Sequence, residues 1–334
     1  MATTTVTVPP LAKNLAATEK KLRDRGVKDL REFLADEEAV KETTKLDLDK
    51  VMKSIFYCYW MSDKPLIQQA LATELADLVL TISVTDDALR FLRSFWETTV
   101  REWSGLDRLR MDKFYMLVRR FVNSSFRLLA KSKWDEVACT EFNAMLTARG
   151  CPLCPDDPKI PQSLAYHLSD IFMEELDKVM SQDSKLAPAP LATLLQPYLS
   201  LAASTGNART FERISTAILR PLFAALQSAV KKPAPSSDED GCERPAKRMR
   251  LDDAALSVLH PSYTATLTNA RLNAPTGGMA AMKVPDLRSR LITWLFEQAS
   301  KEDVREANRR KLYALWKEEM DEQDFALPSR DTKK

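Results

Sequence analysis

Residues 91–120 read FLRSFWETTVREWSGLDRLRMDKFYMLVRR, and they predict two helices joined by a tight turn. Between residues 86 and 103 apolar side chains recur at steps of three and four residues, as on the buried face of a helix. Ser104-Gly105 interrupts this spacing, and glycine suits a helix end because it reaches positive φ angles. Asp107 is predicted to open the second helix, since a carboxylate favours the first turn. The fold class expected from this stretch is all-α.

The second helix has a basic side. Lys113, Arg120 and Arg127 recur at seven-residue spacing and therefore share one side of the helix. Arginine pairs with phosphate bidentately, so this side is a candidate contact surface for RNA or for an acidic partner. A solvated surface, or one paired with neighbouring acids, explains the same residues, and the sequence leaves both readings open. The full candidate set is Arg101, Arg108, Arg110, Lys113, Arg119, Arg120 and Arg127.

Composition limits the classes of protein that fit. The chain has 334 residues and a net charge of only +2, so affinity for nucleic acid has to come from local patches. It has only 7 glycines, which favours helices over sheets. The sequence contains 5 cysteines, no signal peptide and no apolar run of membrane-spanning length, which predicts an intracellular protein without a membrane partner.

The order of apolar segments predicts a HEAT-like helical-repeat solenoid, with about 40 residues per pair of helices. Gly26 is interpreted as a turn between the first two helices. The predicted organisation is a flexible arm (1–10), an α-solenoid domain (11–230), a disordered linker (231–255), an irregular segment (256–285) and C-terminal helices (286–325).

The linker sequence KKPAPSSDEDGCERPAKRMRLD mixes proline with charge and is too poor in apolar residues to fold alone. Lys247, Arg248 and Arg250 form a basic cluster that is typical of a nuclear import signal, which makes an import receptor a predicted partner. A solvated charge run is the alternative. Ser236-Ser237 precedes three acidic residues and is a candidate phosphorylation site.

Two tryptophans, Trp294 and Trp316, lie on the apolar sides of the C-terminal helices. These helices follow the linker and have little sequence around them with which to form a domain. They are therefore predicted to dock on another protein by helix-in-groove packing. Docking on the solenoid itself is the alternative, and the sequence does not decide between the two.

No catalytic signature is visible. Cys151 and Cys154 have the spacing of half a zinc site, but only His167 and Cys139 are nearby as further ligands. The sequence contains no GxGxxG, P-loop, HExxH or GxSxG motif. We therefore expect a protein that is not an enzyme and has neither a cofactor nor a catalytic or metal-binding residue.

Two blocks of sequence resemble a known family. They are IFYCYWMSDKPLIQQALATELADLV (55–79) and FLRSFWETTVREWSGLDRLRMDKFYMLVRRFVN (91–123). Both are similar to the eukaryotic ribosomal RNA processing protein 1 family, a nucleolar group, and SDIFMEELDKV (169–179) resembles a later helix of that family. The resemblance covers residues 11–230.

The resemblance implies a HEAT-like domain in a non-catalytic assembly factor of nucleolar pre-ribosomal particles, needed for large-subunit biogenesis and maturation of precursor ribosomal RNA. The implied neighbours are a Brix-domain factor, a WD-repeat factor, a small basic protein and precursor ribosomal RNA. The implied location is the nucleolus within the nucleus. An alternative function is a general nuclear HEAT-type adaptor that binds peptides or proteins without touching RNA.

Overall fold

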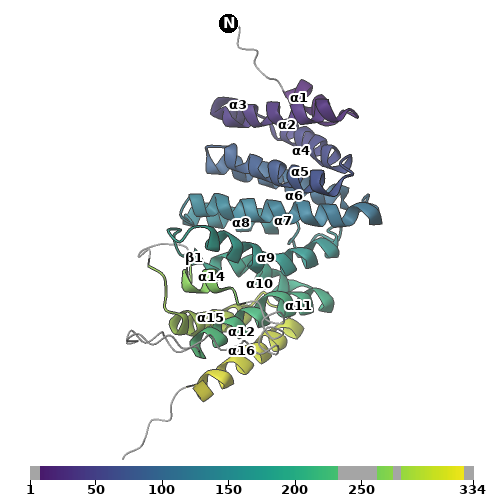
Figure 1. Ribbon diagram of the computed structural model, residues 1–334. Helices are drawn as coiled ribbons and strands as arrows, with labels where there is room; N and C mark the ends of the chain where they lie inside the picture. The colour runs from purple at the N-terminus through teal and green to yellow at the C-terminus, as the bar shows by residue number, and fades with distance from the viewer. Residues whose placement is uncertain (1–7, 232–261, 274–279, 327–334) are drawn as a thin grey trace, which may run out of the picture.

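The computed structural model describes residues 8–231, 262–273 and 280–326. In these ranges almost all regular structure is helical. The helices stack from α1 (Val8–Leu15) at one end to α16 (Glu306–Ala326) at the other, as Figure 1 shows. The predicted all-α, HEAT-like architecture is confirmed. Within the same ranges no helix is both long and apolar enough to cross a bilayer.

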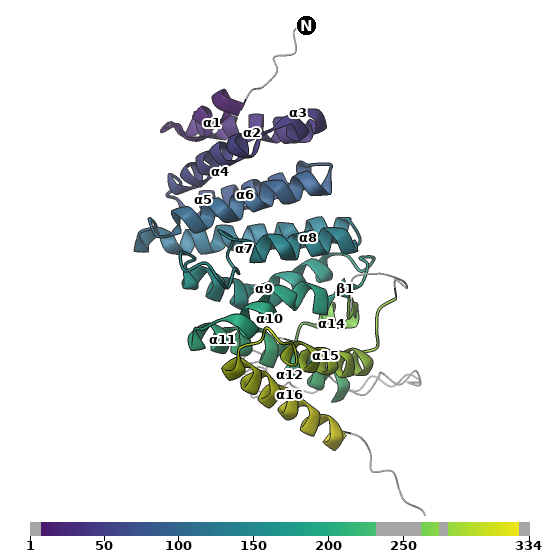
Figure 2. The ribbon, with the colours of Figure 1, turned by 180° about the vertical axis from the view of Figure 1, so that it is seen from behind.

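The helices form two rows with the core between them. One row consists of α4 (Lys45–Trp60), α6 (Thr85–Trp103), α8 (Glu136–Thr147) and α10 (Leu191–Ser204), each packed on the next. The other consists of α5 (Pro65–Asp77), α7 (Arg108–Lys131), α9 (Gln162–Gln182) and α11 (Ala208–Ile214). Figure 2 shows the same stack from behind. One continuous apolar core follows these rows through the length of the solenoid.

The predicted turn between α6 and α7 is present, but glycine has a different role in it. Asp107 caps α7, since its side chain accepts a hydrogen bond from the backbone N–H of Arg110 at 3.0 Å. The φ angle of Gly105 is not positive. Among the described glycines only Gly150 has a positive φ, of 80°. The turn closes instead through the Gly105 N–H, which donates to the Glu102 carbonyl at 3.1 Å.

At the N-terminal end two expectations need correction. Helix α1 begins at Val8, inside the stretch expected to be a flexible arm. Helix α2 (Lys20–Ala35) runs straight through Gly26, which is therefore not a turn. A Cβ atom at Gly26 would lie 2.9 Å from the Leu15 backbone nitrogen, so glycine is needed because α1 crosses α2 closely there. Two short helices, α3 (Glu37–Glu42) and the 3-10 helix η1 (Leu78–Thr81), complete this end.

The C-terminal part folds back onto the solenoid. Helix α11 continues through a π-helical turn, η2 (Ser215–Leu219), into α12 (Arg220–Lys231). After residue 261, α14 (Thr264–Thr268) packs on α9. The two-residue strand β2 (Ala270–Arg271) then pairs in parallel with β1 (Ala189–Pro190). The described part of the segment expected to be irregular is therefore anchored to the α9–α10 region.

The helices expected to dock on a partner belong to the solenoid. Helix α15 (Val284–Ala299) packs on α10 and α12, and α16 packs on α15 and α10. Trp294 is only 8% exposed and belongs to the common core. Trp316 is half-buried, with its ring 5.0 Å from that of Phe296. The partner-docking expectation for Trp294 and Trp316 is corrected, because their own solenoid covers them.

Candidate functional site

The two sequence blocks that resemble the family meet in space through Lys113. Its side chain is 7% exposed, and its Nζ donates to the carbonyls of Trp60 and Ser62 at 2.6 and 2.7 Å. Tyr59 completes the contact, since its hydroxyl donates to the Lys113 carbonyl at 2.9 Å. The expectation that Lys113 shares an exposed basic side with Arg120 and Arg127 is therefore wrong.

The physical reason lies at the end of α4. The last carbonyls of a helix have no partner within the helix and form its negative pole, so a cation placed there is stabilised. Lys113 provides that cation from α7. Burial lowers the pKa of Lys113 to about 8. The side chain thus holds α7 against the C-terminus of α4 and is enclosed by protein.

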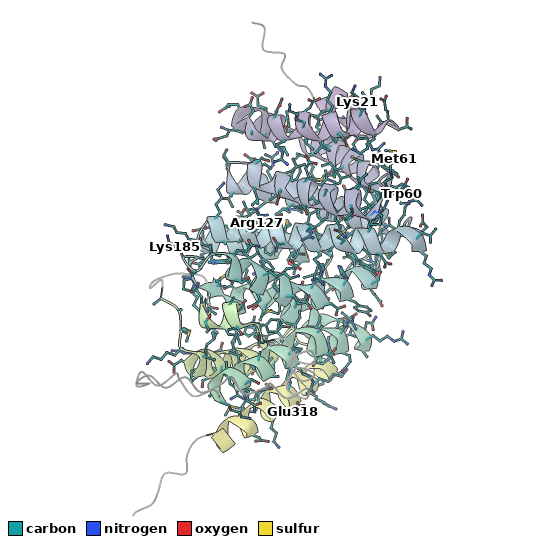
Figure 3. All side chains as sticks on the ribbon, viewed as in Figure 1. Lys21, Trp60, Met61, Arg127, Lys185 and Glu318 are labelled. Atoms are coloured by element: carbon teal, nitrogen blue, oxygen red, sulfur yellow. The ribbon has the colours of Figure 1, made fainter. Side chains whose placement is uncertain are left out.

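Arg110 covers a tryptophan beside this contact. Its guanidinium carbon lies 4.7 Å from the centre of the Trp60 ring, and its Nη1 forms an ion pair with Asp107. Tyr57, whose ring lies 6.2 Å from that of Trp60, donates through its hydroxyl to the Glu102 carboxylate at 3.3 Å. Figure 3 shows Trp60 and Met61 near one side of the solenoid, with Arg127 well away from them. We refer to this cluster as the α4–α7 corner; it comprises Tyr57, Trp60, Glu102, Asp107, Arg108, Leu109 and Arg110.

Two other predicted contact residues are paired with acids on neighbouring helices. Arg119 of α7 lies 2.8 Å from Glu174 and 2.9 Å from Glu175 of α9. Arg127 lies 2.6 Å from Asp77 of α5. Glu175 is 1% exposed, so its carboxylate depends on these partners; Asn123 also donates to it at 3.0 Å. For these two arginines, the paired alternative describes the observed structure.

Such pairs join each neighbouring pair of helices in the row from α5 to α11, and further pairs lie beyond its two ends. We call the set the ion-pair ladder. It comprises Arg31–Glu74 between α2 and α5, Arg127–Asp77 between α5 and α7, Arg119–Glu174 between α7 and α9, Arg213–Asp170 between α11 and α9, and Arg220–Glu318 between α12 and α16. Much of the positive charge on this row is therefore neutralised within the fold.

The remaining predicted cations differ in how free they are. Arg101 is exposed but contacts Glu102 at 3.3 Å and the Thr98 hydroxyl at 3.2 Å. Arg108 and Arg120 are exposed, and neither has an acidic partner within the described residues. Of the seven candidates, these two arginines are therefore the most available for an external anion.

The CxxC pair does not form a metal centre in the described residues. Cys151 is fully buried, and burial raises its pKa to about 12, so it remains a thiol. His167 is half-buried, and its ring Nε2 hydrogen-bonds to the Tyr115 carbonyl at 3.0 Å. Within the described part of the chain, no group of three or more histidine, cysteine or acidic side chains is placed to hold a metal ion.

One pocket was not anticipated from the sequence. It has a volume of about 390 Å³ and lies between α8, α10 and α15. Its lining includes Asn143, Gln196, Ser200 and Trp294, and no charged side chain of the described residues lines it. These residues come from three helices distant in sequence, so no local pattern could have brought them together.

Two predicted sites lie outside the described residues. They are the import signal at Lys247, Arg248 and Arg250 and the phosphorylation site at Ser236-Ser237.

The fold and this arrangement of side chains define a helical-repeat protein of the HEAT-like class. Comparison with known families gives the particular one. The family model described as "Nucleolar protein, Nop52" matches residues 6–316, which includes the α4–α7 corner and most of the C-terminal helices. The chain belongs to the Nop52 family.

Relatives occur across eukaryotes. The human "Ribosomal RNA processing protein 1 homolog A" is 31% identical over 93% of this chain and 70% of the relative. The human homolog B is 35% identical over 64% of this chain but only 27% of the relative. The Drosophila melanogaster homolog is 29% identical over 64% of this chain and 30% of the relative. Most of the length of the last two relatives thus has no counterpart in the aligned region.

Proposed function

We propose that this chain is a non-catalytic assembly factor of nucleolar pre-ribosomal particles, required for processing of precursor ribosomal RNA and for large-subunit biogenesis. The supporting observation is the family match over residues 6–316, together with relatives named for ribosomal RNA processing. A long solenoid with many exposed side chains suits a scaffold that touches several neighbours at once. The neighbours proposed are Brix-domain, WD-repeat and small basic proteins, with an import receptor bringing the chain into the nucleus.

The proposed RNA contact is centred on Arg120. This arginine is exposed near the middle of α7 and has no acidic partner among the described residues. Arg119 and Arg127 lie on the same helix, but each is engaged in the ion-pair ladder. Reversal of their charge would break contacts between helices, so Arg120 is the residue that tests binding separately from folding.

The test is ultraviolet crosslinking with cDNA sequencing of the tagged full chain in cells. We expect crosslinks in precursor large-subunit RNA that decrease in Arg120→Glu and persist in Lys28→Glu, which reverses an exposed charge on α2. Both variants are expected to melt as the wild type does, because exposed substitutions change stability by only about 0.5 kcal/mol.

The general nuclear adaptor is distinguished in the same experiment. An adaptor without RNA contact would give no crosslinks, and its association with particles would not depend steeply on salt. Removal of one phosphate contact is expected to reduce the salt slope by about 1. A wild-type chain that does not sediment with large-subunit precursors would refute the proposed function.

A further inference from the structure

We propose that the α4–α7 corner binds an acidic amphipathic helix of a partner protein. Its apolar side would pack over Leu109 and the edge of Trp60, and one of its carboxylates would pair with Arg108. This proposal rests on the proposed function, because the partner is sought in nucleolar pre-ribosomal particles.

Leu109 is the most exposed large apolar side chain of the described residues, at 91%. It sits in the first turn of α7, between Arg108 and Arg110. Tyr57, also in the corner, is 37% exposed, and Trp60 is half-buried. Tryptophan, tyrosine and arginine are the residues that dominate protein interfaces. The corner therefore presents exposed apolar surface on α4 and on α7, and Leu109 is next in sequence to Arg108, an unpaired cation.

The arrangement disfavours RNA at this place. The Trp60 ring lies 6.1 Å from Phe56, 6.2 Å from Tyr57 and 6.2 Å from Phe114, and Arg110 covers it at 4.7 Å. A ring with so many neighbours is a poor platform for a stacked base. The carboxylates of Glu102 and Asp107 also lie in the corner, and the corner has one unpaired cation, Arg108, which can match a single carboxylate but not the successive charges of a phosphate backbone.

Charge selects an acidic protein segment. Arg110 is paired with Asp107, and Arg101 contacts Glu102, whereas Arg108 has no acidic partner in the described ranges. A single carboxylate from a partner would therefore complete the pairing of the arginines at the corner. Because the apolar surface is small, a helix with a few apolar side chains at steps of three and four residues fits it best.

The test places a photocrosslinking phenylalanine at position 109 of the full chain in cells. The photocrosslinking phenylalanine at position 137 is the control, since Val137 is 62% exposed on α8. We expect an adduct from position 109 whose crosslinked peptide contains apolar residues at helical spacing beside Asp or Glu. Arg108→Ser is expected to reduce this adduct about tenfold, the effect of losing about 1.4 kcal/mol, while Lys28→Ser, which removes an exposed charge on α2, leaves it unchanged.

Several outcomes would overturn the proposal. One is an adduct with RNA, with a second copy of this chain or with a peptide lacking carboxylates. Another is an adduct that persists in Arg108→Ser. The last is the absence of any adduct at position 109. Sedimentation of the wild-type chain with large-subunit precursors is measured separately. If the chain does not sediment with these precursors but still gives the expected adduct, the proposed function is refuted and the proposal for the α4–α7 corner stands.

Discussion

Lys113 illustrates how one buried cation can join two helices. Its ammonium group serves two carbonyls at the end of α4, while its own carbonyl accepts a hydrogen bond from Tyr59. The contact connects residues that are about fifty positions apart in sequence and belong to the two blocks that resemble the family. The lysine thus has a structural role sufficient to explain its place in the motif.

Loss of this ammonium group is expected to destabilise the fold. Lys113→Met keeps the aliphatic stem but leaves two carbonyls without a donor, which costs about 1–3 kcal/mol. Lys53→Met is the control, because Lys53 is exposed on α4. Urea unfolding measures both variants, and equal stability of the two would contradict the structural role of Lys113.

The same lysine predicts a dependence on pH. Its pKa is lowered by burial from 10.5 to about 8 in the folded chain, so the unfolded chain binds more protons between these values. Stability contributed by this group is therefore present above pH 10.5 and is lost as the pH falls through 8. The stability difference between wild type and Lys113→Met should increase from pH 8 to pH 10. A difference that is constant or decreases over this range would contradict the lowered pKa.

Two buried arginines should respond in opposite ways to the same substitution. Arg271 is 5% exposed, and none of its three guanidinium nitrogens has a hydrogen-bond partner among the described residues. Arg288 is equally buried but donates to the Glu319 carboxylate at 3.0 Å. Since an unpaired buried charge is unfavourable, Arg271→Met should raise the stability by about 1 kcal/mol or more. Arg288→Met should lower it by about 3–5 kcal/mol, because Glu319 loses that partner.

Thermal melting of the two methionine variants, side by side, tests this contrast. If Arg271→Met also melts at a lower temperature than the wild type, the arginine must have a partner that the fold does not show.

At the scale of single elements, the helices themselves could be predicted well. Apolar spacing depends only on the helix that contains it, so α6 spans almost the residues predicted for it, and α7 begins directly after the predicted Asp107. The partners of charged residues could not be predicted in this way. Arg127 pairs with Asp77, and Lys113 with α4, because of which helices become neighbours. The sequence therefore predicted which helix carries Lys113, Arg119, Arg120 and Arg127, but not which of these cations are free.

Gly26 tests the packing of one helix pair. In most helix interiors, replacing glycine by alanine stabilises a protein by about 0.5–1 kcal/mol. Here the added methyl group would meet the Leu15 nitrogen at 2.9 Å and the Asn14 carbonyl carbon at 3.1 Å. Gly26→Ala is therefore expected to destabilise the chain by about 1–3 kcal/mol, through displacement of α1. Chemical denaturation measures the sign, and a stabilised variant would show that α1 packs less closely.

For the whole molecule, the last two helices close the solenoid. Leu287, Leu291 and Leu295 of α15 are fully buried in the common core. Deletion of residues 280–334 should therefore expose apolar surface on α10 and α12, lower the melting temperature and increase binding of a hydrophobic dye. The Trp316→Ala variant is a milder comparison, because this side chain is half-buried. An unchanged melting temperature after deletion would show that α15 and α16 are dispensable for the fold.

The pairing of β1 with β2 has a consequence for synthesis on the ribosome. Ala189 and Pro190 leave the exit tunnel well before Ala270 and Arg271, their partners in the strand pair. We therefore expect α9 and α10 to form before β1 has its partner strand, because N-terminal segments fold first during synthesis. For that interval β1 is an open strand edge, and it closes when residues 270–271 leave the tunnel.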